Sequence, residues 1–156
     1  MYCTLNKRQA IQTPKNPLKP YYLTEFYMIY QFEVQVYYED TDHSGVVYHA
    51  NYLKYFERAR EDMLGIPDLV ELWNNAKIGF VVYKANISYR KGAQFGEKLT
   101  IQSQVQKESA YRLRFHQAAY GDISQAAYVE AEIELACVHQ DTGLVPIPQS
   151  VLGRLI

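Results

Sequence analysis

Hydrophobic and polar residues alternate along several stretches of the chain. In one stretch, Val129, Ala131, Ile133, Leu135 and Cys137 fall on one side, and Glu130, Glu132 and Glu134 fall on the other. In another, the residues sharing one side are Val81, Tyr83, Ala85, Ile87 and Tyr89. A period of two is typical of strands that have one face buried in the core and one face exposed to solvent. Such strands form antiparallel sheets. This pattern predicts strands at residues 30–38, 79–90, 97–108, 111–121 and 127–140.

After the first strand the hydrophobic period becomes that of a helix. Within residues 50–65, hydrophobic side chains recur at three- and four-residue spacing, at Tyr52, Tyr55, Phe56, Ala59 and Met63. Such spacing is typical of a helix that buries one face. Gly65 is a suitable residue just beyond the helix end, and Pro67 prevents its continuation. A shorter helical stretch follows at residues 67–77.

The order of these elements predicts the fold class. One strand, one long helix and four further strands follow one another, and residues 141–148 form a turn and exit. A single amphipathic helix packed on about five antiparallel strands is an α+β arrangement of two layers. The strands at 79–90 and 127–139 are long enough to curve round the helix.

The length of the chain predicts a single domain. With 156 residues, the chain can bury a sufficient core without a disulfide or a metal. Residues 1–20 have no sustained period and contain three prolines, so we expect an N-terminal extension at 1–27 outside the core. The domain then spans 28–156, and Met28 could be the natural start.

Composition excludes several functional classes. The net charge of −1 is not that of a protein that binds nucleic acid through bulk charge. No hydrophobic run is long enough to span a bilayer, and no segment resembles a signal peptide, so a cytoplasmic location is expected. Of the two cysteines, Cys3 lies in the extension and Cys137 in a strand, which predicts a buried, reduced thiol. The 15 tyrosines are suited to partly solvated pockets and to interfaces. They are equally typical of ordinary β-strands.

The loop between the first strand and the long helix carries the candidate chemistry. The backbone N–H groups at a helix start can polarise a carbonyl oxygen, and Asp42 lies just upstream as a nucleophile or general base. Gly45 allows close approach of the backbone. The alternative is that Asp42 is a helix cap or part of a solvated turn. His43 and His49 near two acids match no metal-ligand spacing, so no metal is expected.

The segment "VYYEDTDHSGVVYHANYLKYFERAREDML" resembles the opening of the hot-dog-fold acyl-CoA thioesterases of the 4-hydroxybenzoyl-CoA thioesterase type. It is most similar to the YbgC-like, Tol–Pal-associated family. The resemblance implies a long central helix wrapped by a curved antiparallel sheet. It also implies a homo-oligomer, a tetramer built from dimers that pair through their sheets, with no metal or bound cofactor, since coenzyme A is part of the substrate.

The resemblance also implies the roles of particular residues. Asp42 corresponds to the catalytic acid, His49 to the residue whose backbone N–H polarises the thioester carbonyl, and Tyr38 to a tyrosine beside the acid. The residues expected to bind substrate are Gly45, Val46, Tyr48 and Asn51, with Lys107 and Arg112 as candidate contacts to the nucleotide phosphates. His43 and Ser44 stand where relatives often carry alanine and glycine, a difference that could alter acyl selectivity.

The function predicted from the sequence is hydrolysis of a short-chain or aromatic acyl-CoA to a free acid and CoA. One alternative is a hot-dog hydratase or dehydratase, which pairs a histidine with a helix acid. Here His49 and Glu57 are eight residues apart, or roughly 12 Å along a helix. A second alternative is a non-catalytic domain that binds acyl-CoA or acyl carrier protein.

Overall fold

The computed structural model describes residues 28–122, 124 and 126–155. The expected extension at residues 1–27 therefore lies outside the described residues, and so does Cys3. The sheet contains β1 (Tyr30–Gln35), β2 (Ile78–Tyr89), β3 (Lys98–Lys107), β4 (Arg112–Gly121), β5 (Val129–His139) and the two-residue β6 (Gly143–Leu144). The helices are α1 (Asn51–Leu64), α2 (Ile66–Ala76) and α3 (Gln149–Leu155).

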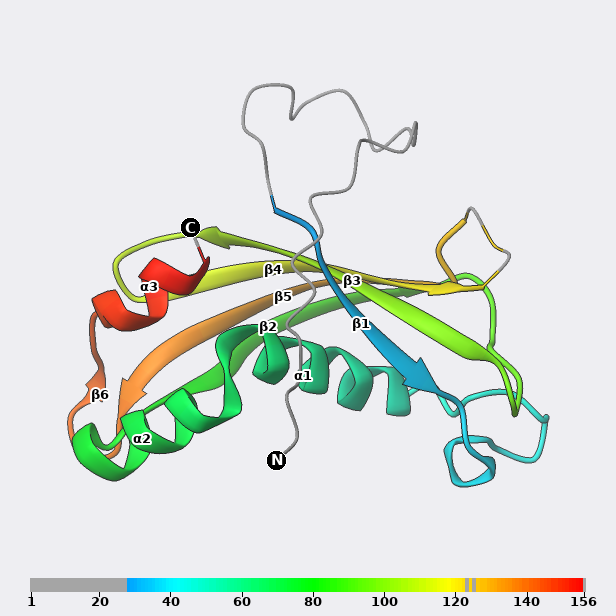
Figure 1. Ribbon diagram of the computed structural model, residues 1–156, viewed down its shortest axis with the longest axis horizontal. Helices are drawn as coiled ribbons and strands as arrows, with labels where there is room; N and C mark the ends of the chain where they lie inside the picture. Colours follow the sequence, from blue (N-terminus) through cyan, green and yellow to red (C-terminus); the bar gives the residue numbers. More distant parts are fainter. Residues whose placement is uncertain (1–27, 123, 125, 156) are drawn as a thin grey trace, which may run out of the picture.

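The architecture is the expected α+β layer pair. The strands follow the order β1-β3-β4-β5-β2, with β6 beside β5, and all of their pairings are antiparallel. Figure 1 shows that the sheet curves over α1, which lies along its inner face. The α1 side chains predicted to face the sheet include Tyr52, Tyr55, Phe56 and Ala59, and all four are buried. Their three- and four-residue spacing therefore correctly predicts the face of α1 that packs against the sheet.

Gly65 ends the central helix as the sequence predicts. It adopts a φ of +89°, a positive value that glycine tolerates and that other residues rarely adopt. Its N–H still donates to the carbonyl of Glu61 at 2.8 Å. The next helix, α2, begins at once with Pro67 in its first turn, where a missing N–H costs nothing.

The end of the first strand and the C-terminal part of the chain differ from the sequence prediction. The first strand ends at Gln35, three residues earlier than expected, because Asp40 accepts a hydrogen bond from the Tyr37 N–H and closes a short 3-10 turn at Tyr38–Asp40. After residue 148 the chain forms α3, which the sequence analysis leaves without an element. This helix is only seven residues long, so its periodicity is too brief to be distinctive.

The outer part of β2 also differs from the prediction. Its alternation predicts one covered face, but Val81, Val82 and Tyr83 are all exposed, Tyr83 by 57%. A bulge lies between Val82 and Lys84, and a bulge shifts the later side chains to the opposite face. β2 is moreover the edge of the sheet and pairs only with β5. An apolar edge strand therefore remains uncovered in the single chain.

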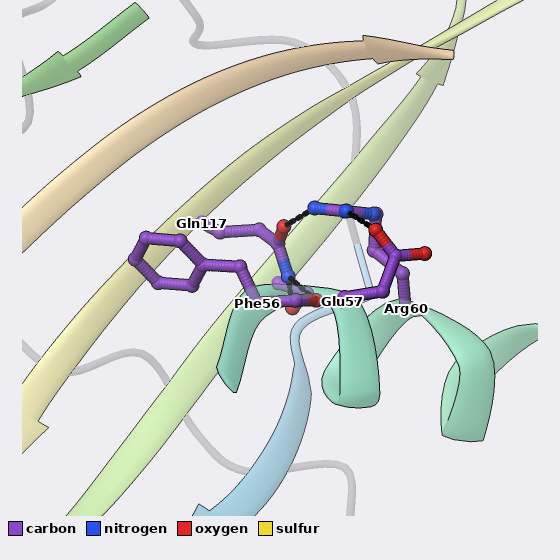
Figure 2. A network of polar contacts seen from close by, with 5 residues as sticks. Phe56, Glu57, Arg60 and Gln117 are labelled. Carbon is purple, nitrogen blue, oxygen red and sulfur yellow. Dashed lines mark hydrogen bonds and ion pairs between the residues drawn. The ribbon is translucent and has the colours of Figure 1, made fainter. Parts of the chain in front are cut away.

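A buried polar network ties the middle of α1 to the sheet. Arg60 is 2% exposed, and its guanidinium donates to Gln117 Oε1 at 2.7 Å. Gln117 Nε2 donates to the Phe56 carbonyl at 3.1 Å and to Ser103 Oγ at 2.8 Å. Figure 2 shows Arg60 between Gln117 and Glu57. Arg60 forms an ion pair with Glu57. Burial lowers the pKa of Arg60, and the nearby Glu57 carboxylate opposes this shift.

Two single side chains on the sheet have well-defined surroundings. Cys137 is buried as predicted and is a free thiol whose pKa burial raises to about 11. His116 lies opposite Glu132 on the neighbouring strand, with Nδ1 3.8 Å from the carboxylate. Cross-strand partners depend on register, which local sequence does not reveal.

Candidate active site

The loop that carries Asp42 is closed by its own backbone hydrogen bonds. The Asp42 N–H donates to the Val46 carbonyl at 3.0 Å, and the Gly45 N–H donates to the Asp42 carbonyl at 3.0 Å. Gly45 has a φ of +81°, which a residue with a side chain rarely adopts. Thr41 and Val47 form an antiparallel bridge at the base of the loop. The loop is therefore a tight turn that presents Asp42 at its start.

Ser44 holds the carboxylate of Asp42. Its backbone N–H donates to Asp42 Oδ1 at 2.8 Å, and its hydroxyl donates to the same oxygen at 2.5 Å. These bonds lower the pKa of Asp42, the hydroxyl bond most strongly, and His43 and His49 add smaller contributions. Hydrogen bonds to a carboxylate favour its charged form. Asp42 is therefore ionised at neutral pH and keeps its Oδ2 available.

The N-terminus of α1 lies beside this acid without a side-chain cap. The N-cap residue is Ala50, which has no side-chain oxygen to offer, so Asp42 is not a helix cap. Within the described part of the chain, the backbone N–H groups of His49 and Ala50 have no hydrogen-bond acceptor. Unpaired N–H groups at a helix start carry partial positive charge and attract a negative oxygen. An acceptor from a ligand is therefore suited to this position.

Two cavities meet at Asp42. One, of about 470 Å³, is lined by Tyr38, Thr41, Asp42, His43, Gly45 and Phe95. The rings of Tyr38 and Phe95 meet edge to face there, with centroids 6.0 Å apart. The other, of about 300 Å³, is lined by Asp42, Val46, Val47, His49, Tyr52, Tyr89, Arg90, Lys91 and Gly92. The smaller cavity therefore brings together the acid and the residue at the uncapped helix start.

A segment from after β2 forms the far wall of the smaller cavity. The Val47 N–H donates to the Ala93 carbonyl at 2.8 Å, and the Ala93 N–H donates to the Tyr52 hydroxyl at 2.9 Å. At Gly92, a side chain would approach Val46 Cβ to 2.8 Å, closer than packed carbon atoms come. The glycine therefore allows residues 90–93 to press against the loop of Asp42.

The predicted site residues do not all lie together. Tyr38, Gly45 and Val46 line one cavity or the other, as do Asp42 and His49. Tyr48 and Asn51 line neither, and the Asn51 amide donates to the Asp40 carbonyl at 2.9 Å, where it braces the loop.

The two basic residues expected near the nucleotide lie elsewhere within this chain. Lys107 ends β3 and Arg112 begins β4, at the opposite end of the sheet from the loop of Asp42 (Figure 1). The guanidinium of Arg112 instead stacks over the ring of Tyr83, 4.0 Å from its centroid. Ten residues of strand span about 33 Å, so neither side chain reaches the Asp42 cavities of its own chain.

Sequence reasoning missed the wall residues of the smaller cavity. Tyr89, Arg90 and Lys91 follow a strand pattern and then a turn, and nothing local connects them to Asp42. The adjacent basic pair is the only sequence signal that could have drawn attention to them.

No group of three or more His, Cys, Asp or Glu side chains arranged to hold a metal occurs in the part of the chain that the structure describes. Among the same residues, none of the helices has the length and apolar character needed to cross a bilayer.

A family model and individual known proteins that are similar to this chain are all described as thioesterases. The family model described as the thioesterase-like superfamily matches residues 36–155. The acyl-CoA thioesterase YbgC of Haemophilus influenzae is 34% identical over 111 residues, which make up 70% of this chain and 80% of that protein. The acyl-CoA thioester hydrolase YbgC of Escherichia coli is 35% identical over 111 residues, covering 70% of this chain and 82% of that protein.

Solved structures agree with this result. A probable thioesterase from Bartonella henselae is 30% identical, with a TM-score of 0.70 over 77% of this chain and 99% of that chain. A mutant of 4-hydroxybenzoyl CoA thioesterase in complex with 4-hydroxybenzoyl CoA has a TM-score of 0.75 at 14% identity, over 82% of this chain and 99% of that chain. The second likeness concerns the fold alone. Together with the curved sheet around α1, it confirms the expected hot-dog fold.

Proposed function

This chain belongs to the thioesterase-like superfamily, and we propose that it hydrolyses an acyl-CoA thioester to a free acid and coenzyme A. The observation that carries the proposal is the smaller cavity, in which Asp42 and His49 at the uncapped start of α1 line one space. Thioester hydrolysis needs a polarised carbonyl and a base or nucleophile beside it, and this cavity has residues suited to both tasks.

The chemistry follows from these groups. The thioester carbonyl oxygen accepts hydrogen bonds from the N–H groups of His49 and Ala50, which stabilise the negative charge that develops on it. Asp42 then acts in one of two ways. It attacks the carbonyl carbon and expels the thiolate, leaving an acyl–aspartyl anhydride that water hydrolyses, or it takes a proton from the water that attacks. In both routes the products are the free acid and the thiol. No metal or prosthetic group is needed, because CoA is part of the substrate.

The acyl group we propose is short-chain or aromatic. We place it in the smaller cavity, whose volume of about 300 Å³ suits a compact acyl group. Its carbon chain would pack against Tyr52, Tyr89 and Val47, which line the same cavity. The test is release of free thiol from short aliphatic, long aliphatic and benzoyl-type acyl-CoAs. We expect kcat/KM to be at least about tenfold higher for the short or aromatic substrates, since a long chain exceeds this cavity. A preference for long chains would contradict this assignment, and no turnover of any thioester would contradict the function.

The structure gives little support to a hydratase or dehydratase. That chemistry pairs a histidine with a helix acid, and the candidate acid is Glu57. Its carboxylate forms an ion pair with Arg60, and it lines neither cavity at Asp42. In this chain Glu57 therefore has a structural partner and no access to His49.

The proposed enzyme is a homo-oligomer in the cytoplasm, a tetramer built from dimers. The exposed edge of β2 supports the dimer, because a long apolar edge strand is a template for pairing with another strand, and a second copy of β2 supplies one. The free thiol of Cys137 fits a reducing compartment. An acyl carrier protein presents the same pantetheine thioester and is an alternative donor of the acyl group.

Substitution of Val82 by glutamate is expected to disrupt the dimer from which the proposed tetramer is built, and so to lower the mass of the assembly. Val82 is 52% exposed on β2, and two copies of the new carboxylate would be buried close together at a β2–β2 interface, which is strongly unfavourable. Light scattering after size-exclusion chromatography gives the mass. The matched control is Gln31→Glu on β1, an exposed position at the opposite edge of the sheet, which should leave the mass unchanged. A Val82→Glu protein of unchanged mass would exclude β2 as the interface.

A further inference from the structure

Lys91, which lines the smaller cavity, contacts the buried side chain of Tyr128. Its ammonium donates to the Tyr128 hydroxyl at 2.7 Å and lies 4.2 Å from the centroid of the Tyr128 ring. An ammonium over an aromatic face is stabilised by the ring electrons. A lysine ammonium has three N–H donors, so two remain available after the bond to Tyr128.

The position of this lysine is set by its surroundings. Tyr128 is 5% exposed, and its hydroxyl fills the space beside Gly121, where a side chain would approach within 2.5 Å. The backbone N–H groups of Arg90 and Lys91 both donate to the Tyr128 carbonyl, at 2.8 and 3.1 Å. Lys91 is itself exposed, but it is anchored through both its backbone and its side chain.

The two adjacent cations at this wall differ in their partners. Arg90 forms an ion pair with Glu130, at 2.5 Å. Lys91 forms no ion pair with a carboxylate of the described residues. The bond to Tyr128 raises the pKa of Lys91, with a smaller contribution in the same direction from Glu97, so the ammonium stays protonated. Asp42 and Lys91 thus line one cavity, and the ammonium of Lys91 keeps donors available for a further acceptor.

We propose that Lys91 binds an anionic group on the acyl part of the substrate and so selects acyl-CoAs whose acyl chain ends in an acid. This inference rests on the proposed function and names its substrate class. An anion on Lys91 has two sources, the acyl group or the phosphates of CoA. The acyl group fits better, because Lys91 and Asp42 line the same cavity of about 300 Å³. The pantetheine arm, with its two amide units, separates the phosphates from the thioester carbon by more than such a cavity spans.

The experiment compares glutaryl-CoA with pentanoyl-CoA, which have equally long acyl chains and differ in the terminal carboxylate. The same two acyl groups are also tested on N-acetylcysteamine, which lacks the phosphates. The readout is the ratio of kcat/KM for the acidic over the neutral thioester. We expect Lys91→Met to lower this ratio by at least about tenfold with both carriers, the scale of one charge-assisted hydrogen bond. Lys91→Arg should retain most of it.

Lys98→Met is the matched control, since Lys98 is an exposed lysine that lines neither cavity, and it should leave the ratio unchanged. An unchanged ratio in Lys91→Met would overturn the proposal. A loss in Lys91→Met that is equal for both CoA thioesters and absent for both N-acetylcysteamine thioesters would also overturn it, because the lysine would then contact the phosphates.

A binding measurement separates this proposal from the proposed function. Calorimetry compares the affinities of glutaryl-CoA and pentanoyl-CoA for Asp42→Asn, with and without Lys91→Met. A tenfold loss of selectivity supports the role of Lys91 even if the protein hydrolyses neither compound, and equal selectivity overturns it. Absence of turnover in the wild-type protein concerns the catalytic proposal alone.

Discussion

Replacement of Asp42 by asparagine is expected to lower the rate of thiol release from a good acyl-CoA substrate by about 10³-fold, a loss typical of a removed general base or nucleophile. Asparagine has the same shape and keeps an oxygen that can accept from Ser44, as Asp42 Oδ1 does at 2.8 and 2.5 Å. The loop should therefore retain its conformation while the negative charge is lost. Thiol release at saturating substrate measures the effect.

Binding of acyl-CoA to the same variant distinguishes the competing functions. A thioesterase should bind substrate with nearly unchanged affinity after Asp42→Asn and no longer turn it over. A domain that only binds acyl-CoA would show no turnover in either form. Equal turnover in wild type and Asp42→Asn would show that another residue performs the chemistry.

Ser44→Ala serves as a control with its own signature. The Ser44 hydroxyl is the largest cause that holds the pKa of Asp42 below its ordinary value of 3.8. The reaction needs ionised Asp42, so activity is lost as the pH falls through this pKa. Removal of the hydroxyl raises the pKa, and the acid limb of the kcat/KM profile should move to higher pH. The activity at neutral pH should persist, because Asp42 remains ionised there.

Replacement of Gln117 by leucine is expected to lower the free energy of unfolding by about 3 kcal/mol, because it leaves buried polar groups without partners. Gln117 accepts from Arg60 and donates to the Phe56 carbonyl and to Ser103. Leucine of similar size fills the space but meets none of these groups. Urea unfolding at fixed protein concentration measures the loss.

A second substitution should recover part of this stability. Arg60→Met removes the buried charge while keeping most of the volume, and a buried ionic group replaced by apolar side chains is often tolerated. The double variant should therefore be more stable than the sum of the single losses indicates, by at least about 1 kcal/mol. Gln102→Leu, on the opposite face of β3 with respect to Ser103, is the control and should change stability by less than about 0.5 kcal/mol. Strict additivity would show that Arg60 and Gln117 do not act as a unit.

Features that depend on near neighbours along the chain could be predicted from the amino-acid sequence. The strands and the central helix follow from periods of two and of three to four residues, and Gly65 marks the helix end. The loop of Asp42 closes through bonds between residues two to four apart. Resemblance could locate Asp42 and His49 because both lie in one short segment before α1.

Contacts that depend on strand register and on the packing of one surface against another could be found only in the folded protein. Arg60 and Gln117 are 57 residues apart, and Lys91 and Asp42 line one cavity beside the close approach of Gly92 to Val46. Such contacts arise when strands pair and layers pack, and no local pattern encodes them. The apolar β2 follows the same rule, because alternation predicts that a face is to be covered but cannot state whether the same chain or a second copy covers it.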